Sequence, residues 1–203
     1  MKLLKHISVL NDRFTFEPKI IYMKNLFLIL FLSASSIFGL QTIQAQNFPE
    51  MDASPLDLVM ARPDKKSAPL ARVIYSRPQK KGRVVFGELV PYGEVWRTGA
   101  NEATELTIYT PLMFGKTLLK PGTYTLYTIP NEETWTIIIN GDTNVWGAFS
   151  YKKEKDLARM NVPVRDAAAP IESLSMIFRP EGNGTTLMIG WDNQYVEIPF
   201  KKQ

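Results

Sequence analysis

Apolar and polar residues alternate in short runs from Leu70 to the end of the chain. A period of two, in segments rich in β-branched and aromatic residues, is typical of strands with one buried face. The pattern predicts strands around residues 73–75, 83–86, 104–110, 123–129, 135–140, 174–178, 187–191 and 196–200. Residues 160–164 alternate in the same way, although Pro163 would confine that strand to a sheet edge because it lacks an N–H group.

The alternation also predicts the core and the architecture. Only residues 152–157 have a helical character, enough for one or two turns. Roughly eight to ten short strands separated by turns are typical of sandwiches and barrels. We therefore predict an all-β fold, an antiparallel β-sandwich of jelly-roll type with at most one short helix. The side chains expected inside it are Trp135, Ile137, Leu187, Ile189, Val196 and Ile198.

Turn-forming residues separate the predicted strands. Gly115-Lys116 suits a two-residue hairpin, and Asp192-Asn193 suits a turn with positive φ. Residues 182–184, Gly-Asn-Gly, indicate a close connection between two further strands.

The N-terminal part indicates targeting. Residues 23–25 give a short positive start, residues 26–32 are continuously apolar, and a small and polar stretch ends at Ala45. This is the pattern of a cleaved signal peptide over residues 23–45; a membrane anchor is the alternative, but the apolar run is marginal for a span. Residues 1–22 fit this pattern badly, so we interpret them as a mis-annotated extension.

The remainder divides into two parts. Residues 46–69 are polar and rich in proline, and we expect a flexible tether there. Residues 70–203 are expected to form one domain. The predicted protein is thus exported, periplasmic or extracellular, with no membrane span after cleavage of the signal.

Composition excludes several chemistries. The chain has no cysteine, which excludes disulfides and thiolate nucleophiles, and its single histidine, His6, precedes the predicted domain. A Ser-His-Asp triad and a His- or Cys-ligated zinc site are therefore excluded there, and we expect no metal and no cofactor. The leader holds five of the 24 Lys and Arg residues and two of the 20 Asp and Glu residues, which leaves 19 against 18. This nearly equal number of basic and acidic residues gives no electrostatic basis for binding nucleic acid. The sequence does not indicate an oligomeric state.

The densest group of recognition chemistry lies in residues 96–104. Trp96 could stack on a sugar or base, Arg97 could bind a carboxylate or phosphate, and Asn101 could both donate and accept. With Glu102 these residues are candidates for one polar network beside a pocket. The alternative is structural: Arg97 pairs with Glu102, Asn101 caps a turn and Trp96 belongs to the core.

Two further groups are candidates for ligand binding. Arg77 and Arg83 flank a basic turn that could form an anion-binding rim, or simply a solvated hairpin tip. Trp146 and Tyr151 could form an aromatic platform for a saccharide, or pack at the edge of the core while Asp156 pairs with Arg159.

These residues favour a non-catalytic binding module for a polar ligand, either a saccharide or an anion. The alternatives are a carboxylate-dependent glycan hydrolase with Glu102 as acid or base, and an interaction domain with no small-molecule site. No catalytic residue can be assigned.

The chain also resembles a family of exported bacterial proteins defined as a domain of unknown function, the DUF 2911 group. The resemblance lies in residues 75–83, 86–93, 96–104, 121–124, 146–147 and 191–192, and it covers nearly the whole predicted domain. It implies export and one compact domain, and it carries no activity.

Overall fold

The computed structural model describes residues 46–203 and, in the leader, Met23, Asn25, Leu26 and Leu28, which are helical. The chain divides into two units, Met1–Pro49 and Glu50–Gln203. Most of the predicted signal peptide and the whole predicted extension lie outside the described residues. Within the described part, no helix has both the length and the apolar character needed to cross a bilayer.

The unit Glu50–Gln203 is all-β, as predicted. Its strands form one open, nine-stranded antiparallel sheet in the order β1-β2-β3-β6-β7-β8-β9-β4-β5, so β1 and β5 are the edges. The predicted helical turn is a 3-10 helix of three residues, η1 (Lys153–Lys155). The strands are β1 (Leu56–Ala61), β2 (Ala71–Ser76), β3 (Glu105–Ile108), β4 (Leu112–Phe114), β5 (Thr117–Leu119), β6 (Gly122–Ile129), β7 (Thr134–Asn140), β8 (Asp156–Glu181) and β9 (Gly184–Lys202).

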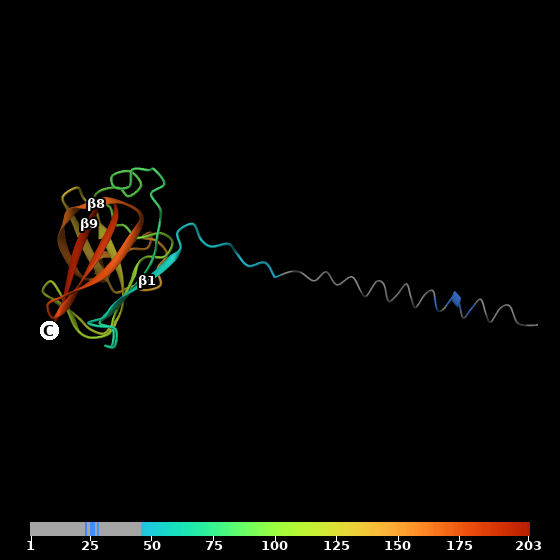
Figure 1. Cartoon of the computed structure of the whole chain (residues 1–203), viewed down its shortest axis with the longest axis horizontal. Helices are drawn as coiled ribbons and strands as arrows, with labels where there is room; N and C mark the ends of the chain where they lie inside the picture. The colour runs from blue at the N-terminus through green and yellow to red at the C-terminus, as the bar shows by residue number, and fades with distance from the viewer. Residues whose placement is uncertain (1–22, 24, 27, 29–45) are drawn as a thin grey trace, which may run out of the picture. The chain divides into compact units, whose positions relative to one another are not determined.

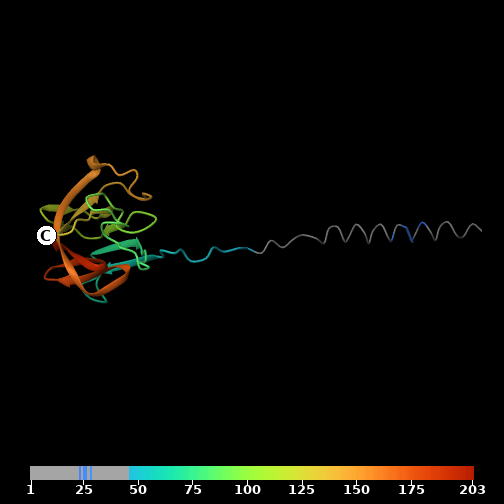
Figure 2. The same cartoon turned by 90° about the horizontal axis from the view of Figure 1, so that it is seen from above.

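The last two strands are much longer than expected. The predicted strands at 160–164 and 174–178 are both parts of β8, and those at 187–191 and 196–200 are both parts of β9. Figures 1 and 2 show both strands strongly curved. The turn predicted at Asp192-Asn193 is wrong: Asp192 has a φ of 56°, but the opposite strand shifts register between Asp166 and Ile171, so the chain bends without reversing.

Pro163 does not confine β8 to an edge. β8 pairs with β7 as far as Pro163 opposite Thr134, and with β9 from Val164 opposite Val196. Because Thr134 is the first residue of β7, the proline lies where that ladder ends. Its missing N–H group therefore costs the sheet little.

The segment expected to be a tether contains β1. All six residues of this strand pair with β2, from Leu56 opposite Ser76 to Ala61 opposite Ala71. Its large apolar side chains point outward, with Leu56 66% and Leu58 46% exposed. The face that packs inward carries Asp57, Val59 and Ala61, so this strand lacks the large buried apolar residues on which the prediction relied.

The strand predicted over residues 83–86 is absent. Lys81 and Gly82 both have positive φ, 50° and 72°, which turns the chain back before a strand can begin. Val85 and Phe86 are still buried, but they reach the core from a loop in which Phe86 bridges to Val90.

The larger of two buried clusters fills the interior, and the smaller contains Ala103, Tyr127 and Ile138. All six side chains predicted to be inside are fully buried, at 0% exposed. The larger cluster includes residues of strands from both ends of the sheet order. Four rings meet near its centre, with Phe86 and Trp135 5.0 Å apart between centroids and Trp96 and Trp191 nearby. This aromatic group supports the loop that follows Trp96.

After β2 the chain lies beside the second half of β8. Gln79 bridges to Ser173, the Lys80 N–H donates to the Glu172 carbonyl at 2.7 Å, and the Met176 N–H donates to the Tyr75 hydroxyl at 2.9 Å. These contacts fix the basic turn formed by residues 77–83.

Candidate functional site

The loop of residues 96–104 is fastened to the sheet at both ends. Trp96 exchanges two backbone hydrogen bonds with Thr128 on β6, at 2.7 and 3.0 Å. At its other end, the Thr104 N–H donates to the Arg97 carbonyl at 3.0 Å, and the Thr104 hydroxyl donates to the Thr98 carbonyl at 2.8 Å. The loop is therefore a closed, rigid feature.

The backbone of the loop turns sharply at two non-glycine residues. Thr98 and Asn101 have φ of 56° and 57°, in the left-handed region. Between them Gly99 lies so close to β2 that an added Cβ would meet the Ser76 carbonyl at 3.0 Å. Consecutive side chains of the loop consequently face in different directions.

Two cavities flank the loop. The first, here named the Trp146 groove, has a volume of about 520 Å³ and the second, the Arg97 pocket, about 420 Å³. Ser54 lines both. The polar residues of the groove are Asp52, Ser54, Ser76, Asn101, Glu102, Glu105, Thr125 and Asn144, and those of the pocket are Ser54, Gln79, Lys81, Arg83 and Arg97.

Trp146 forms one wall of the groove, and its side chain is 60% exposed. Backbone contacts hold it against the loop: Glu102 bridges to Trp146, and the Ala103 N–H donates to the Val145 carbonyl at 2.9 Å. The Gly147 N–H donates to the Asn101 carbonyl at 3.1 Å. The backbone that carries the exposed indole is thus fixed against the loop.

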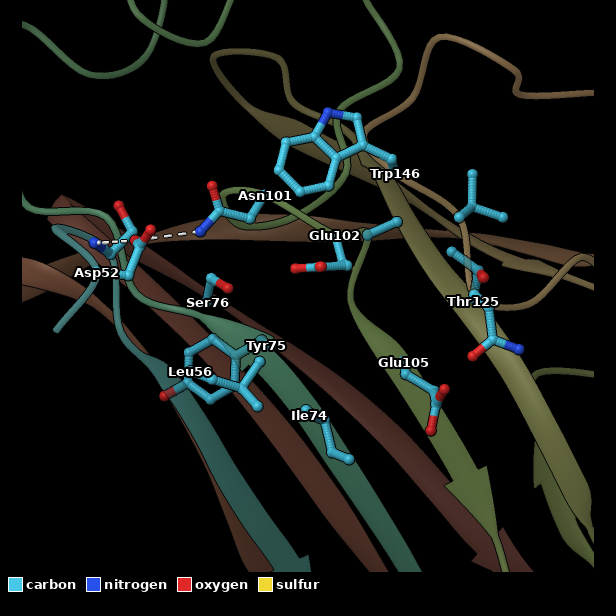
Figure 3. Close-up of a pocket in the computed structure, with 14 residues that line it drawn as sticks. Asp52, Leu56, Ile74, Tyr75, Ser76, Asn101, Glu102, Glu105, Thr125 and Trp146 are labelled. Carbon is cyan, nitrogen blue, oxygen red and sulfur yellow. Dashed lines mark hydrogen bonds between the residues drawn. The ribbon is translucent and has the colours of Figure 1, made fainter. Parts of the chain in front are cut away.

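Polar groups converge below this ring (Figure 3). The Asn101 amide donates to Asp52 Oδ1 at 3.1 Å, and the same oxygen accepts the Ser54 N–H at 2.6 Å. Glu102 lies between Trp146 and Ser76 in Figure 3. Glu105, lower in the groove, pairs with Arg72 at 3.7 Å. The groove therefore combines an aromatic face with amide, hydroxyl and carboxylate groups.

The Arg97 pocket has the opposite charge. Lys81, Arg83 and Arg97 line it, and no carboxylate does. Its apolar wall includes Trp96, which stacks on Trp191.

A family model described as a protein of unknown function, DUF2911, matches residues 54–200. The chain belongs to the DUF2911 family. No curated protein and no solved structure matches it significantly. The matched residues of this DUF2911 domain include β1 and every lining residue of both cavities except Asp52 and Ala53.

Six of the eight predicted site residues line a cavity of the DUF2911 domain. Asn101, Glu102 and Trp146 line the groove, and Arg83, Trp96 and Arg97 line the pocket. The expected network joining Arg97 to Glu102 is not formed: these two residues lie on different cavities, and no ion pair within residues 46–203 joins them. The left-handed turns at Thr98 and Asn101 separate them.

Arg77 lines neither cavity and ties strands together. Its Nη1 donates to Asp57 of β1 at 3.1 Å, and its Nε and Nη2 donate to Leu174 and Ser175 of β8 at 3.0 and 2.8 Å. Its role in this structure is to join β1, β2 and β8.

Tyr151 also lies outside both cavities. Its hydroxyl donates to Asp156 Oδ2 at 2.6 Å and accepts from Arg159 Nη2 at 2.5 Å, while its ring packs edge-on to Tyr127 at 5.2 Å. Burial, followed by the hydrogen bond to Asp156, raises the pKa of Tyr151 from 10.0 to about 12. The alternative in which Asp156 pairs with Arg159 is realised, at 2.7 Å.

Among the site residues that sequence reasoning missed are Asp52 and Ser54. Both fall in the segment interpreted as a tether, and the only signal was the Asp-Ala-Ser-Pro sequence, which favours a turn in which the Asp side chain accepts a backbone N–H. Within the described residues, no three Asp, Glu, His or Cys side chains gather as metal ligands.

Proposed function

We propose that this DUF2911 domain is a non-catalytic binding module that holds a saccharide in the Trp146 groove. The observation that carries the proposal is the exposed indole of Trp146 beside the converging side chains of Asn101 and Glu102. An aromatic face of this size in water is costly to leave uncovered, and the flat apolar face of a sugar ring is its natural complement.

The polar lining matches the remaining requirements of a sugar. Hydroxyl groups of a saccharide both donate and accept, and the Asn101 amide and the Glu102 carboxylate together supply both functions. The volume of about 520 Å³ lies within the range of roughly 300–1,000 Å³ typical of small-molecule sites.

Binding is favoured over hydrolysis by the setting of Glu102. A glycosidase needs a carboxylic acid held in an enclosed, apolar environment so that it stays protonated at neutral pH. Glu102 is exposed. A glycan hydrolase with Glu102 as its acid is the second candidate, because Asp52 and Glu105 line the same groove and could act as its partner.

We further propose that the protein is exported and that its sheet is a sandwich, as the sequence pattern predicts. The support for the sandwich is the main buried cluster, which includes Val73 and Ile137 from one half of the sheet order and Leu187 and Phe200 from the other. Side chains from two facing sheet layers would share one core in this way.

Calorimetric titration of the protein with a panel of neutral oligosaccharides tests the proposed function. We expect saturable binding by the native protein and its loss in Trp146→Ala. Phe149→Ala is the matched control, because Phe149 is 86% exposed in the same loop and lines neither cavity.

Two outcomes would decide against this function. New reducing ends that depend on Glu102 would establish the hydrolase. If no glycan binds, or if the native protein and Trp146→Ala bind equally well, the groove is not a saccharide-binding site.

A further inference from the structure

We propose that the Arg97 pocket is a second binding site, one that takes the oxyanion group of a small molecule: a carboxylate, phosphate or sulfate. Trp96, Arg97, Gly99 and Ala100 of the loop line this site, whereas Asn101, Glu102 and Ala103 line the Trp146 groove. The proposal does not depend on whether the groove binds a saccharide.

Arg97 supplies the first argument. Its Nε atom is buried and has no hydrogen-bond partner, and Arg97 forms none of the ion pairs found within residues 46–203. A buried donor on a charged group is expensive to leave unsatisfied. Arg77, by contrast, is paired with Asp57. Arg97 thus has no carboxylate partner and lines a cavity of about 420 Å³. A ligand with a negative charge would supply the partner that the guanidinium lacks.

The charges around the pocket supply the second argument. Lys81 and Arg83 line it together with Arg97, and no Asp or Glu does. Two acids of β8 and β9 are engaged with the neighbouring basic turn: Asp192 pairs with Lys80, and Glu172 accepts the Lys81 N–H at 2.7 Å. The pocket therefore keeps a positive field that no residue of its own lining neutralises.

Hydrogen bonds to backbone carbonyls hold the Arg83 guanidinium at the Arg97 pocket. Its Nε donates to the Lys80 carbonyl at 2.9 Å and its Nη2 to the Gln79 carbonyl at 2.5 Å. Gln79 is in turn bridged to Ser173 of β8. Because this turn is anchored to the sheet, the Arg83 guanidinium is already ordered at the rim of the pocket before a ligand binds. Binding therefore costs little further side-chain entropy at Arg83.

The apolar wall defines the rest of the ligand. Leu89, Val90 and Trp96 line the pocket beside the cations. Such a wall lowers the local dielectric and strengthens the attraction between Arg97 and an anion. We infer a small molecule with one anionic group and an apolar or ring-shaped body, since a bare inorganic ion would leave this wall uncovered.

Titration of the native protein with inorganic phosphate, sulfate and benzoate, followed by calorimetry and by thermal melting, tests the proposal. We expect at least one of the three to bind saturably and to raise the melting temperature. Benzoate binding more tightly than the inorganic ions would identify an organic carboxylate as the ligand class; the reverse order would identify a phosphate or sulfate ester.

Three variants make the test specific. Arg97→Gln should weaken binding by about tenfold or more, because it removes the charge and the paired donors, and Arg97→Lys should lie between it and the native protein. Arg165→Gln is the control: it removes a surface cation that pairs with Glu197 and lines neither cavity, and it should bind as the native protein does.

The proposal fails if none of the three anions binds, or if Arg97→Gln and Arg165→Gln weaken binding equally, which would indicate general attraction to positive charge. Melting of Arg97→Gln without anion checks that it folds. Trp146→Ala should keep anion binding and Arg97→Gln should keep saccharide binding, so failure at one cavity is separable from failure at the other.

Discussion

Trp96 stacks on Trp191, with ring centroids 6.0 Å apart and ring planes 17° from parallel. Trp191 belongs to β9, whereas Trp96 begins the loop that separates the two cavities. Trp135 of β7 meets Trp96 edge-on at 6.2 Å. The three indoles therefore connect the loop to two strands that come from different regions of the sheet, and the positions of both cavities depend on this packing.

Two of these tryptophans allow a matched test of one hydrogen bond. Trp191 Nε1 donates to the Glu172 carbonyl at 3.1 Å, whereas Trp135 Nε1 is buried without a partner. Replacement by Phe removes similar ring volume at both positions. We expect Trp191→Phe to lower the free energy of unfolding by about 1 kcal/mol more than Trp135→Phe does. Urea unfolding of both variants measures the difference, and equal losses would show that the Glu172 contact contributes nothing.

Ile189 and Ile177 test the facing of the longest hairpin. Ile189 on β9 is fully buried, and Ile177 on β8 is 54% exposed. Ile189→Ala should cost about 2–5 kcal/mol of stability, through lost burial and the cavity left behind. Ile177→Ala should cost less than about 1 kcal/mol, from strand propensity alone. Chemical unfolding of the two variants is the measurement; a larger cost for Ile177→Ala than for Ile189→Ala would mean that the hairpin faces the other way.

Tyr151 should make the stability of the folded protein fall as the pH rises in the alkaline range. Its pKa is raised from 10.0 to about 12 by burial and by its hydrogen bond to Asp156, so the folded state favours the neutral phenol. This contribution is complete below pH 10, where the unfolded tyrosine is also neutral, and it is lost as the pH rises towards about 12. Tyr151→Phe should therefore flatten the fall in melting temperature over this range.

The control for this experiment is Tyr109→Phe, at a tyrosine that is 38% exposed at the end of β3 and outside the Tyr151 cluster. It should leave the alkaline fall unchanged. If Tyr151→Phe and the native protein lose stability in parallel above pH 10, the contact with Asp156 does not hold the proton.

The inward faces of the sheet were predictable because they obey a simple rule. Val196 and Ile198 are buried and alternate with the partly exposed Glu197 and Pro199, and burial of one face requires that alternation. The rule failed at β1, where the larger side chains of Leu56 and Leu58 are exposed. It failed again at Phe86, which is buried without belonging to a strand. Apolar character shows that a residue can be buried, and it does not show which backbone conformation brings it to the core.

The candidate site was predictable as a region and not as an arrangement. Residues 96–104 were identified from their mixture of aromatic, amide and charged groups, and they line both cavities. The side on which Arg97 and Glu102 lie depends on the positive φ at Thr98 and Asn101, and neither residue type requires that conformation. Asp52 joins Asn101 from a segment about 50 positions away, a contact that no local pattern specifies.

The pairing of β4 with β9 has a consequence for how the chain acquires its fold. Phe114 pairs with Phe200 and Leu112 with Lys202, so the β4–β5 hairpin, made from the middle of the domain, has its neighbouring strand at the C-terminal end. Contacts this distant in sequence form slowly, because a long loop must close before they form. The hairpin is therefore left without a neighbour while the chain is being synthesised, and the sheet becomes complete only after the last strand has emerged from the ribosome.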